Sequence, residues 1–210
     1  MAAELLKIHP VNPEQRKIRH VVEVLSRGGL IVYPTDTVYG IGCDLMNKKA
    51  IDRLCQVRGL KPQRQLNLSF MCHDLSQVSE YARRIDTPVF KMMKRAYPGP
   101  FTFILEAGGK VPKVVEGNKK TVGVRIPNHR VPLEIIQLLG NPLVNASIKN
   151  EDTIREYTTD PEEMWNDLRH VVDIVIDSGA GGNVPSTVVD CTGDEIVMKR
   201  QGLGDLDVLY

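Results

Sequence analysis

The apolar residues of this chain recur with the periods of helices and of strands in turn. Between residues 13 and 27 they return every three to four positions, which is the spacing of one helix face, and Gly28-Gly29 ends the pattern. Asn12 directly precedes Pro13, a pair typical of a helix start, so Asn12 is the predicted N-cap. The residues that form this face are Ile18, Val21, Val22 and Leu25.

Further helices and strands follow in alternation. We expect helices after Asn47, after Asp74, after Thr87-Pro88, over 132–139 and after Asp160, each beginning at a capping residue or a proline. Clusters of β-branched residues predict strands at 30–33, 66–71, 102–106, 121–126, 143–148, 172–176, 186–190 and 196–200. The last two are expected to form a hairpin. This alternation predicts an α/β fold, a single domain around one twisted mixed sheet.

Composition narrows the classes of function. The 210 residues are 42% hydrophobic, enough for a sizeable core, and 27 Lys and Arg against 26 Asp and Glu leave a formal net charge of +1. Such a chain does not hold nucleic acid as a global polycation, so any RNA contact needs a local patch. The sequence has no signal peptide and no stretch apolar enough to span a bilayer, which predicts a cytoplasmic protein with no membrane partner.

The cysteines and histidines do not suggest a metal site. No C-x-x-C pair occurs among the four cysteines, so we expect reduced core thiols, and the five histidines lack metal-ligand spacing. No phosphate-loop motif, dinucleotide-binding glycine motif or nucleophile elbow occurs either. We therefore assign no metal ligand and no catalytic nucleophile.

Two segments combine small residues with hydroxyl groups beside a predicted strand. In Pro34–Gly42, Thr35 and Thr37 could donate to a carboxylate or phosphate, and Gly40 and Gly42 could let a ligand approach the backbone. A structural turn is an equally good interpretation of this segment. The second segment, 179–190, places a glycine run before Ser186, and the glycines fit either a lid or a loose connection.

Basic residues form candidate anion-binding positions. Arg58, Lys61, Arg64 and the segment 125–130 could meet phosphates, although a solvated surface is the favoured interpretation for Lys61, Arg64 and Arg130. Arg125 differs because it ends an apolar strand, where an unpaired charge is costly. We therefore expect a fixed anionic partner or ligand for Arg125.

Five segments, in order, resemble the YrdC/YciO family of threonylcarbamoyl-AMP synthases and their relatives. The resemblance covers residues 9–206, expected as one YrdC-like domain after a short extension over 1–8. The matching segments are Tyr33–Gly42 with Y-P-T-[DE]-T-V-Y-G-L-G, Tyr97–Thr102 with W-P-G-P-L-T, Val122–Pro127 with V-G-V-R-x-P, Ser186–Asp190 with S-T-V-V-D, and Arg200 with Gly202 as the closing R-x-G.

The resemblance implies a concave, positively charged groove and a reaction. L-threonine, bicarbonate and ATP, with Mg²⁺, would give threonylcarbamoyl-AMP and pyrophosphate for the modification of tRNA, in concert with tRNA-modification proteins. It further implies that Thr35 and Ser186 hold the threonine end, and that Arg58, Lys61, Ser147 and Arg200 serve the nucleotide. Arg125 would serve an anion or brace the groove. This task is mostly positioning, so it requires no protein nucleophile.

Three positions depart from the pattern of the active synthases. Arg58-Gly59-Leu60 stands where they carry Lys-x-Arg, Ser147-Ile148-Lys149 stands for Ser-x-Asn, and Met71 replaces a histidine. Lys61, Arg64 or Lys149 could supply the missing cation. These departures resemble the YciO branch, and the loss of one charge-assisted contact costs about 1.5–3 kcal/mol, which predicts weakened nucleotide binding.

Three hypotheses remain open at this point. The first is a YciO-type protein that binds ATP and forms the threonylcarbamoyl adenylate. The alternative is a double-stranded RNA or tRNA-binding protein that keeps the groove without the catalysis, using Arg58 and Lys61 together with the possible RNA or anion ligands Arg64, Arg125, Arg130 and Lys149. The third is an unrelated binder of small carboxylates.

Overall fold

The structure is a computed structural model that describes residues 2–59, 68–116, 120–147 and 158–210. Its strands form one sheet in the order β1-β8-β2-β3-β7-β4-β6-β5-β9-β10. The strands are β1 Glu4–Lys7, β2 Ile31–Tyr33, β3 Gly40–Asp44, β4 Ser69–Met71, β5 Phe101–Glu106, β6 Thr121–Arg125, β7 Leu143–Ser147, β8 Ile174–Asp177, β9 Thr187–Asp190 and β10 Val197–Arg200. The sheet contains both parallel and antiparallel pairs, so the predicted mixed sheet is confirmed.

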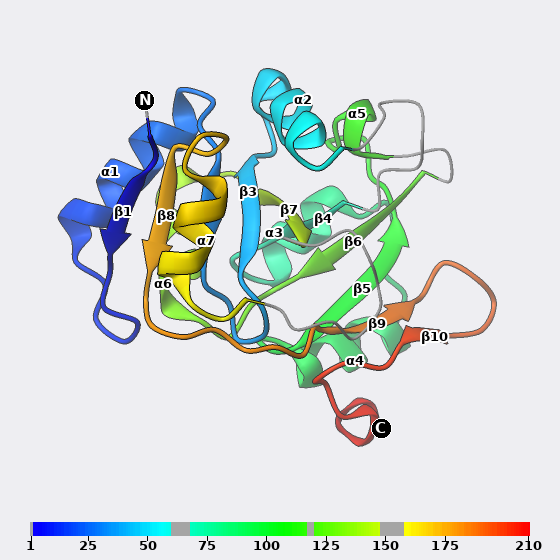
Figure 1. The fold of residues 1–210 in the computed structure, drawn as a ribbon. Coiled ribbons are helices and arrows are strands. Elements are labelled where there is room, and N and C mark those ends of the chain that lie inside the picture. The colour runs from blue at the N-terminus through cyan, green and yellow to red at the C-terminus, as the bar shows by residue number, and fades with distance from the viewer. Residues whose placement is uncertain (1, 60–67, 117–119, 148–157) are drawn as a thin grey trace.

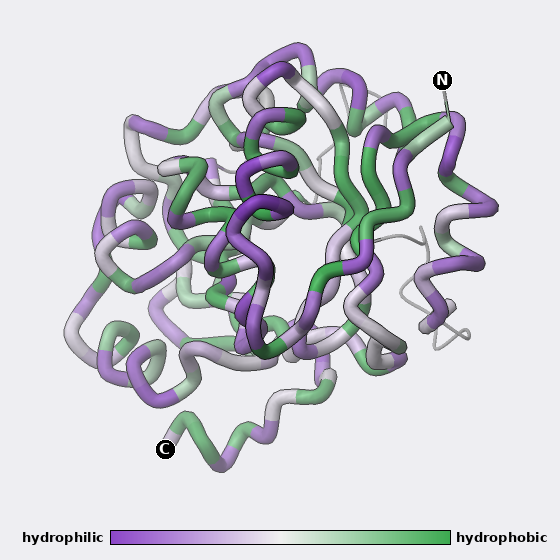
Figure 2. The backbone as a smooth tube through the Cα atoms, turned by 90° about the vertical axis from the view of Figure 1, so that its left-hand side faces the viewer, coloured by the Kyte–Doolittle hydropathy of each residue, from purple (hydrophilic) through white to green (hydrophobic). Residues whose placement is uncertain are grey.

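Helices cover both faces of this sheet (Figure 1). They are α1 Gln15–Ser26, α2 Lys48–Val57, α3 Leu75–Tyr81, α4 Thr87–Ala96, α5 Lys113–Glu116, α6 Arg130–Leu139 and α7 Pro161–Leu168, followed by the 3-10 helix η1 Leu206–Leu209. The tube of Figure 2 is green along the central strands, whereas the helices alternate between green and purple. This is the pattern of amphipathic helices packed on an apolar sheet.

Successive residues of the inner strands belong to two apolar clusters on opposite faces of the sheet. Ile174 of β8 belongs to the cluster that α1 and α6 cover, while its neighbour Val175 belongs to the larger cluster on the other face. β2 shows the same alternation, because Val32 lies in the larger cluster and Tyr33 in the smaller one. Met71, at the position of the family histidine, is 2% exposed in the cluster with α1 and α6.

The predicted helix starts are confirmed at three caps and wrong at one. Asn47 Oδ1 accepts from the amide of Ala50 at 3.1 Å, and Asp74 and Asp160 cap α3 and α7 in the same way. Asn12, however, does not cap α1, whose N-cap is Glu14. The amide of Asn12 instead donates to His9 Nδ1 at 3.1 Å, so the turn is built around His9 and the helix begins later.

Two strands lie where the sequence analysis placed none. The sequence predicts a ligand loop or a turn over Pro34–Gly42, yet Gly40–Asp44 forms β3 and pairs antiparallel with both β2 and β7. The two glycines hid it, because glycine disfavours strands. Glu4–Lys7 forms β1 and pairs parallel with β8, so part of the expected 1–8 extension lies in the sheet. The boundaries of the 9–206 domain stay a prediction.

The elements after β3 agree with the predicted order. The strand expected over 66–71 is seen as β4, and residues 66 and 67 lie outside the described part of the chain. β9 and β10 pair antiparallel, as the predicted hairpin requires. Cys43, Cys55 and Cys72 are buried free thiols, and Cys191 is a half-buried one. Within the described residues, the helices are too short or too polar to cross a membrane.

We predict that Gly42→Ala destabilises the fold. A Cβ at Gly42 would lie 2.5 Å from the carbonyl oxygen of Val144 and 2.9 Å from the Tyr33 ring, so β3 would have to shift within the sheet. Overpacking of this kind costs about 1–3 kcal/mol in the free energy of unfolding. Urea denaturation measures it, with Gly109→Ala as the control because a Cβ there meets nothing within 4 Å. Equal midpoints for the two variants would contradict the prediction.

Candidate functional site

The candidate site lies where the loop between β2 and β3 meets the C-terminal end of β6. In Figure 1, β6 runs diagonally across the molecule, so its end comes close to the lower end of β3. The loop, residues 34–39, contains Thr35, Asp36 and Thr37, and β6 ends at Arg125. Two of the five segments that resembled the family therefore meet at one place.

A buried ion pair joins the two segments. Arg125 Nη2 donates to Asp36 Oδ1 at 2.6 Å, and the side chains are 4% and 13% exposed. Arg125 Nη1 also donates to Thr37 Oγ1 at 2.7 Å, and its Nε points to the Gly99 carbonyl at 3.4 Å. The prediction that Arg125 has a fixed anionic partner is confirmed. Because its guanidinium is buried on these acceptors, the geometry favours a bracing role over contact with an RNA phosphate.

The hydroxyl of Thr35 is used entirely by its own loop. Its Oγ1 donates to the carbonyl of Val38 at 2.8 Å and accepts from the amide of Thr37 at 3.0 Å. The Thr37 hydroxyl lies 3.1 Å away, and because Thr35 gives its single proton to Val38, Thr37 is the donor in this contact. A threonine hydroxyl has one proton and two lone pairs, so this network saturates Thr35. A ligand carboxylate that takes this proton must displace the Val38 carbonyl.

A second polar group lies at the start of β9. Ser186 Oγ is 2.8 Å from Thr102 Oγ1, and both side chains are buried. Arg200 donates to the Ser186 carbonyl through Nε at 3.2 Å and through Nη2 at 3.0 Å. Either hydroxyl can be the donor in the Ser186–Thr102 bond. If Thr102 donates, the proton of Ser186 is free for a ligand.

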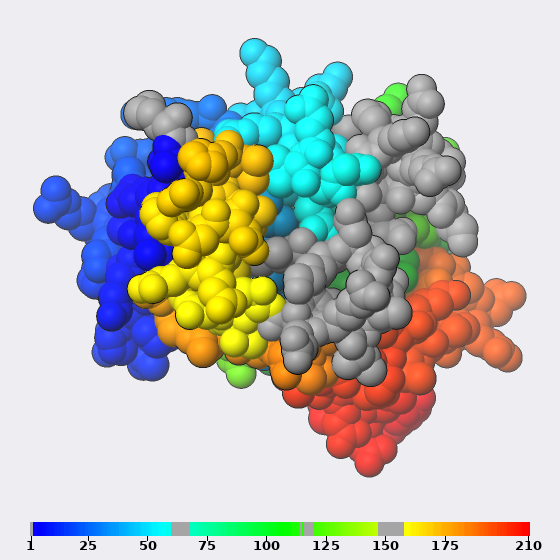
Figure 3. Space-filling model, viewed as in Figure 1, coloured from blue at the N-terminus to red at the C-terminus, as the bar shows by residue number. Residues whose placement is uncertain are grey.

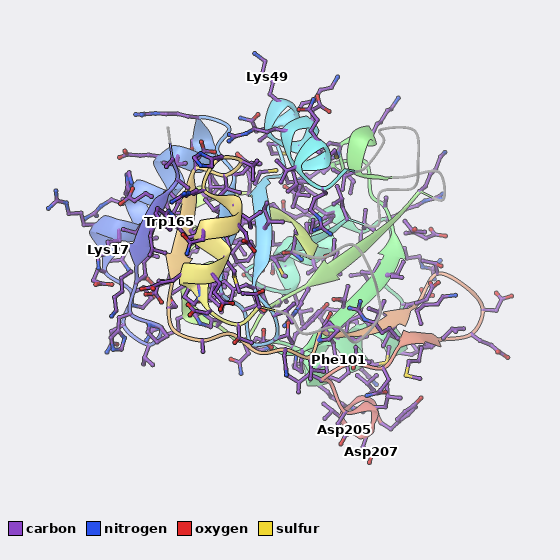
Figure 4. The ribbon with its side chains drawn as sticks, viewed as in Figure 1. Lys17, Lys49, Phe101, Trp165, Asp205 and Asp207 are labelled. Carbon is purple, nitrogen blue, oxygen red and sulfur yellow. The ribbon has the colours of Figure 1, made fainter. Side chains whose placement is uncertain are left out.

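The segment Pro98–Pro100 connects the two polar groups. Gly99 donates its amide to the Ile126 carbonyl at 2.9 Å, next to Arg125, and Pro100 accepts from the amide of Thr187 at 2.9 Å. Phe101, labelled in Figure 4, begins β5 directly after this segment. A Cβ at Gly204 would stand 2.7 Å from the Phe101 ring. The close packing of these residues fixes Ser186 relative to the loop that carries Thr35.

The glycine segment after β8 is packed against the same loop. Tyr39 Oη donates to the Gly179 carbonyl at 2.7 Å and accepts from the amide of Ser178 at 3.2 Å. A Cβ at Gly181 would lie 2.5 Å from the Tyr39 ring, and Gly182 touches the backbone of Thr37. Burial raises the pKa of Tyr39 to about 12, so its hydroxyl stays protonated as a donor. Gly181 and Gly182 are therefore packed against the loop, while Gly179 and Ala180 are exposed.

One expectation about the loop is wrong. Gly40 and Gly42 do not leave their backbone open to a ligand, because the ring of Tyr33 lies against both of them. Tyr33 Oη donates to Asn145 Oδ1 at 2.8 Å across the same strand. The absence of a Cβ at these two positions makes room for a tyrosine of the protein itself.

The predicted basic residues fall in different settings. Arg58 follows α2 directly as its C-cap residue, and Arg130 begins α6, where Nη2 lies 3.5 Å from Glu134 Oε1 at the surface. Ser147 ends β7, where Gly40 pairs with it. Lys61, Arg64 and Lys149 lie outside the described residues, as does Leu60. The nucleotide, RNA and groove-charge assignments of these residues stay predictions.

His129 is a further titratable group near the loop. Burial lowers the pKa of His129, and the nearby Asp36 carboxylate opposes that shift. His129 Nδ1 accepts from the amide of Val131 at 3.3 Å, which places the proton of the neutral ring on Nε2. Across the part of the chain that the structure describes, no group of three His, Cys, Asp or Glu side chains could hold a metal ion.

The sequence alone did not identify two residues of the site, Thr102 and Tyr39. Thr102 was treated as strand, but its hydroxyl is the partner of Ser186. Its signal is a polar residue between Phe101 and Phe103 in an otherwise buried run. Tyr39 was noted only as part of the motif, and nothing in the sequence points to its bond with Gly179, which lies 140 residues further along the chain.

The chain belongs to the Sua5/YciO/YrdC family, whose description is "Telomere recombination" and which matches residues 23–202. It is 38% identical to the Escherichia coli protein named "Uncharacterized protein YciO" over 97% of this chain and 98% of that one. The threonylcarbamoyl-AMP synthase of Pseudoalteromonas translucida is 28% identical over 87% of this chain and 97% of that protein.

Solved structures agree with the family. The crystal structure of E. coli YciO has a TM-score of 0.91 and 37% identity, and the match covers 99% of this chain and all of that one. The structure of Pyrococcus abyssi Sua5 complexed with L-threonine has a TM-score of 0.84 and 29% identity, covering 94% of this chain and 57% of Sua5. The YrdC-like α/β fold is thereby confirmed, and the family includes threonylcarbamoyl-AMP synthases.

We predict that Arg125→Met destabilises the protein strongly. The substitution leaves the Asp36 carboxylate buried without its cation, which costs about 3–5 kcal/mol in the free energy of unfolding. Chemical denaturation measures the loss. Arg130→Met is the matched control, because Arg130 is 61% exposed and its 3.5 Å pair with Glu134 should contribute less than about 1 kcal/mol.

The double variant Arg125→Met/Asp36→Asn tests whether the two side chains act as an ion pair. Removing both charges should recover part of the loss, because the buried carboxylate is then neutral. If the double variant is as unstable as the sum of the two single ones, the pair does not act as an ion pair.

Proposed function

We propose that this protein binds L-threonine and ATP and forms L-threonylcarbamoyl-AMP. The reaction consumes L-threonine, bicarbonate and ATP and releases pyrophosphate. Threonine and bicarbonate give a carbamate with loss of water, and a carbamate oxygen attacks the α-phosphorus of ATP, so that pyrophosphate leaves. The adenylate then serves threonylcarbamoyladenosine modification of tRNA in the cytoplasm, together with tRNA-modification proteins.

One observation carries the proposal. Thr35 and Ser186 lie at the two motifs expected to hold threonine. Thr35 is tied through Thr37 and Arg125 to the Gly99 carbonyl, and the next residue, Pro100, accepts from the amide of Thr187, the neighbour of Ser186. A relative with 29% identity over 94% of this chain has been solved with L-threonine. Two small hydroxyls held at fixed positions suit the carboxylate and hydroxyl of a short amino acid.

The residues perform this reaction by positioning. The carbamate and the α-phosphate must be held in line, and a rigid site supplies this at no cost during the chemical step. Arg125 and Asp36 keep the loop in place, and Tyr39 keeps the segment 178–182 against it. Ser186 presents its side chain beside Thr102, and no residue needs to form a covalent intermediate.

For the nucleotide, we propose Arg58, Lys61, Ser147 and Arg200 as the residues that meet the phosphates and ribose. Arg200 lies next to Ser186, to whose carbonyl it donates, so a phosphate bound to Arg200 is adjacent to the threonine position. Mg²⁺ usually binds through substrate phosphates with one or two carboxylates, so it would enter with ATP. Its contribution is to neutralise charge on the phosphates.

The test is pyrophosphate release measured with ATP, Mg²⁺, L-threonine and bicarbonate at high enzyme concentration. We expect release that depends on threonine and a product with the mass of the threonylcarbamoyl adenylate. The departures at Leu60 and Lys149 predict a slow rate relative to the P. translucida enzyme. Threonine-independent hydrolysis, or no release at all, sinks the synthase proposal.

Two hydroxyl deletions locate the threonine position. Ser186→Ala should raise the KM for threonine about ten- to hundredfold, which is the loss of one bond to a charged group. Thr35→Val should raise it less, because a ligand there only exchanges one bond for the bond to Val38. The KM for ATP should change little. Thr192→Val and Ser26→Ala are matched controls, because their hydroxyls bond only to Asp190 and Val22. An equal rise in both KM values would mean that the variants disturb the fold rather than the threonine contact.

A further inference from the structure

The two edges of the sheet are protected very differently. At the first edge, β1 carries the charged residues Glu4 and Lys7, and α1 reaches over it. His20 Nε2 lies 2.7 Å from the Glu4 carboxylate, and Lys17 Nζ donates to the Lys7 carbonyl at 2.6 Å. Charged side chains and a covering helix are the usual protection against pairing with another strand.

At the second edge, three consecutive exposed apolar residues lie at the start of β10, the first of them directly before the strand. Ile196, Val197 and Met198 are 47%, 43% and 46% exposed. Single apolar residues at a surface are ordinary, but a run of three on an edge strand is typical of an interface. Figure 1 shows no other element outside β10, and the hairpin stands out from the body of the protein in the space-filling view of Figure 3.

The backbone of β10 is open on its outer side. Among the residues that the structure describes, β10 pairs only with β9, through Val197 with Asp190 and Met198 with Val189. A bulge between Met198 and Arg200 ends the regular stretch. The free edge of β10 is therefore short: the strand begins at Val197, Glu195 and Ile196 directly precede it, and the regular pairing ends at Met198.

The charges that flank this stretch are self-complementary. Together with the residues on either side, the sequence reads Glu195-Ile196-Val197-Met198-Lys199, acidic at one end and basic at the other. Two such strands that run antiparallel about a two-fold axis at Val197 place each Glu195 opposite Lys199 of the second copy. Ile196 of each copy then lies opposite Met198 of the other. Lys199 already lies 3.5 Å from Asp190 Oδ2, so it would stand between two carboxylates.

We propose that β10 pairs with β10 of a second copy of this chain, in the register that sets Val197 opposite Val197. The two sheets then continue as one across the interface. Five residues on each side bury little surface, so the dimer is weak and its population depends on concentration. This inference concerns the far edge of the sheet, and it holds whether or not the site makes the adenylate.

A charge swap tests the register. Sedimentation velocity over about 10 µM to about 1 mM should show a monomer–dimer equilibrium for the natural sequence. Glu195→Lys alone sets two lysines opposite each other, and Lys199→Glu sets two glutamates so, and each should weaken the dimer about tenfold. The double variant restores both pairs and should return the dissociation constant to within about threefold of the original.

Cysteine cross-linking gives an independent readout. In a Cys191→Ser background, Val197→Cys places two thiols at the two-fold axis, at the Cα separation that a disulfide needs. Met198→Cys is the control, because its cysteine faces Ile196 of the second copy and its own counterpart lies too far away. We expect an oxidised dimer from Val197→Cys and much less from Met198→Cys.

Several outcomes overturn the proposal. A monomer at every concentration rules out the dimer, and a double swap that stays as weak as the single variants rules out the Glu195–Lys199 pairing. Faster cross-linking through Met198→Cys than through Val197→Cys rules out the register. Thermal midpoints of all variants show whether each one is folded, so that a lost dimer is not confused with a lost fold.

Discussion

The ion pair between Arg125 and Asp36 is the interaction on which the arrangement of the site depends. A guanidinium that is 4% exposed has lost its hydration, which costs several kcal/mol unless good acceptors replace the water. Asp36, Thr37 and the Gly99 carbonyl supply them from two different segments of the chain. If the loop or Gly99 moves, the buried Arg125 guanidinium loses hydrogen-bond acceptors. The free energy that this would cost keeps the two segments in place.

The loop is also held at both of its ends by the sheet. β2 leads into it at Tyr33, and β3 receives it at Gly40, the residue paired with Tyr33. Tyr33 turns its ring over Gly40 and Gly42 and gives its hydroxyl to Asn145 on β7, so three neighbouring strands share one side chain. This explains why a segment with two glycines forms a central strand. The packing that they allow offsets their poor strand propensity.

The sequence predicts what depends on neighbours along the chain and fails where distant residues decide. The caps at Asn47, Asp74 and Asp160 were predictable because a cap bonds to an amide two or three residues away. The cost of burying a charge predicts an anionic partner for Arg125. Only the fold shows that this partner is Asp36, 89 residues away. β3 was missed because its stability comes from Tyr33 and Asn145, which no local pattern reveals.

The state of the hydroxyls bears on how a threonine would be held under the proposed function. The single proton of Thr35 goes to the Val38 carbonyl, so a substrate carboxylate exchanges one bond for another and gains only the difference. Ser186 shares one bond with Thr102, and with Thr102 as the donor in that bond the proton of Ser186 remains for a ligand. Net affinity would therefore come mainly from the Ser186 side, and Thr35 would mainly orient the substrate. A site divided in this way binds its amino acid modestly and positions it well, which favours the rate of reaction over tight binding.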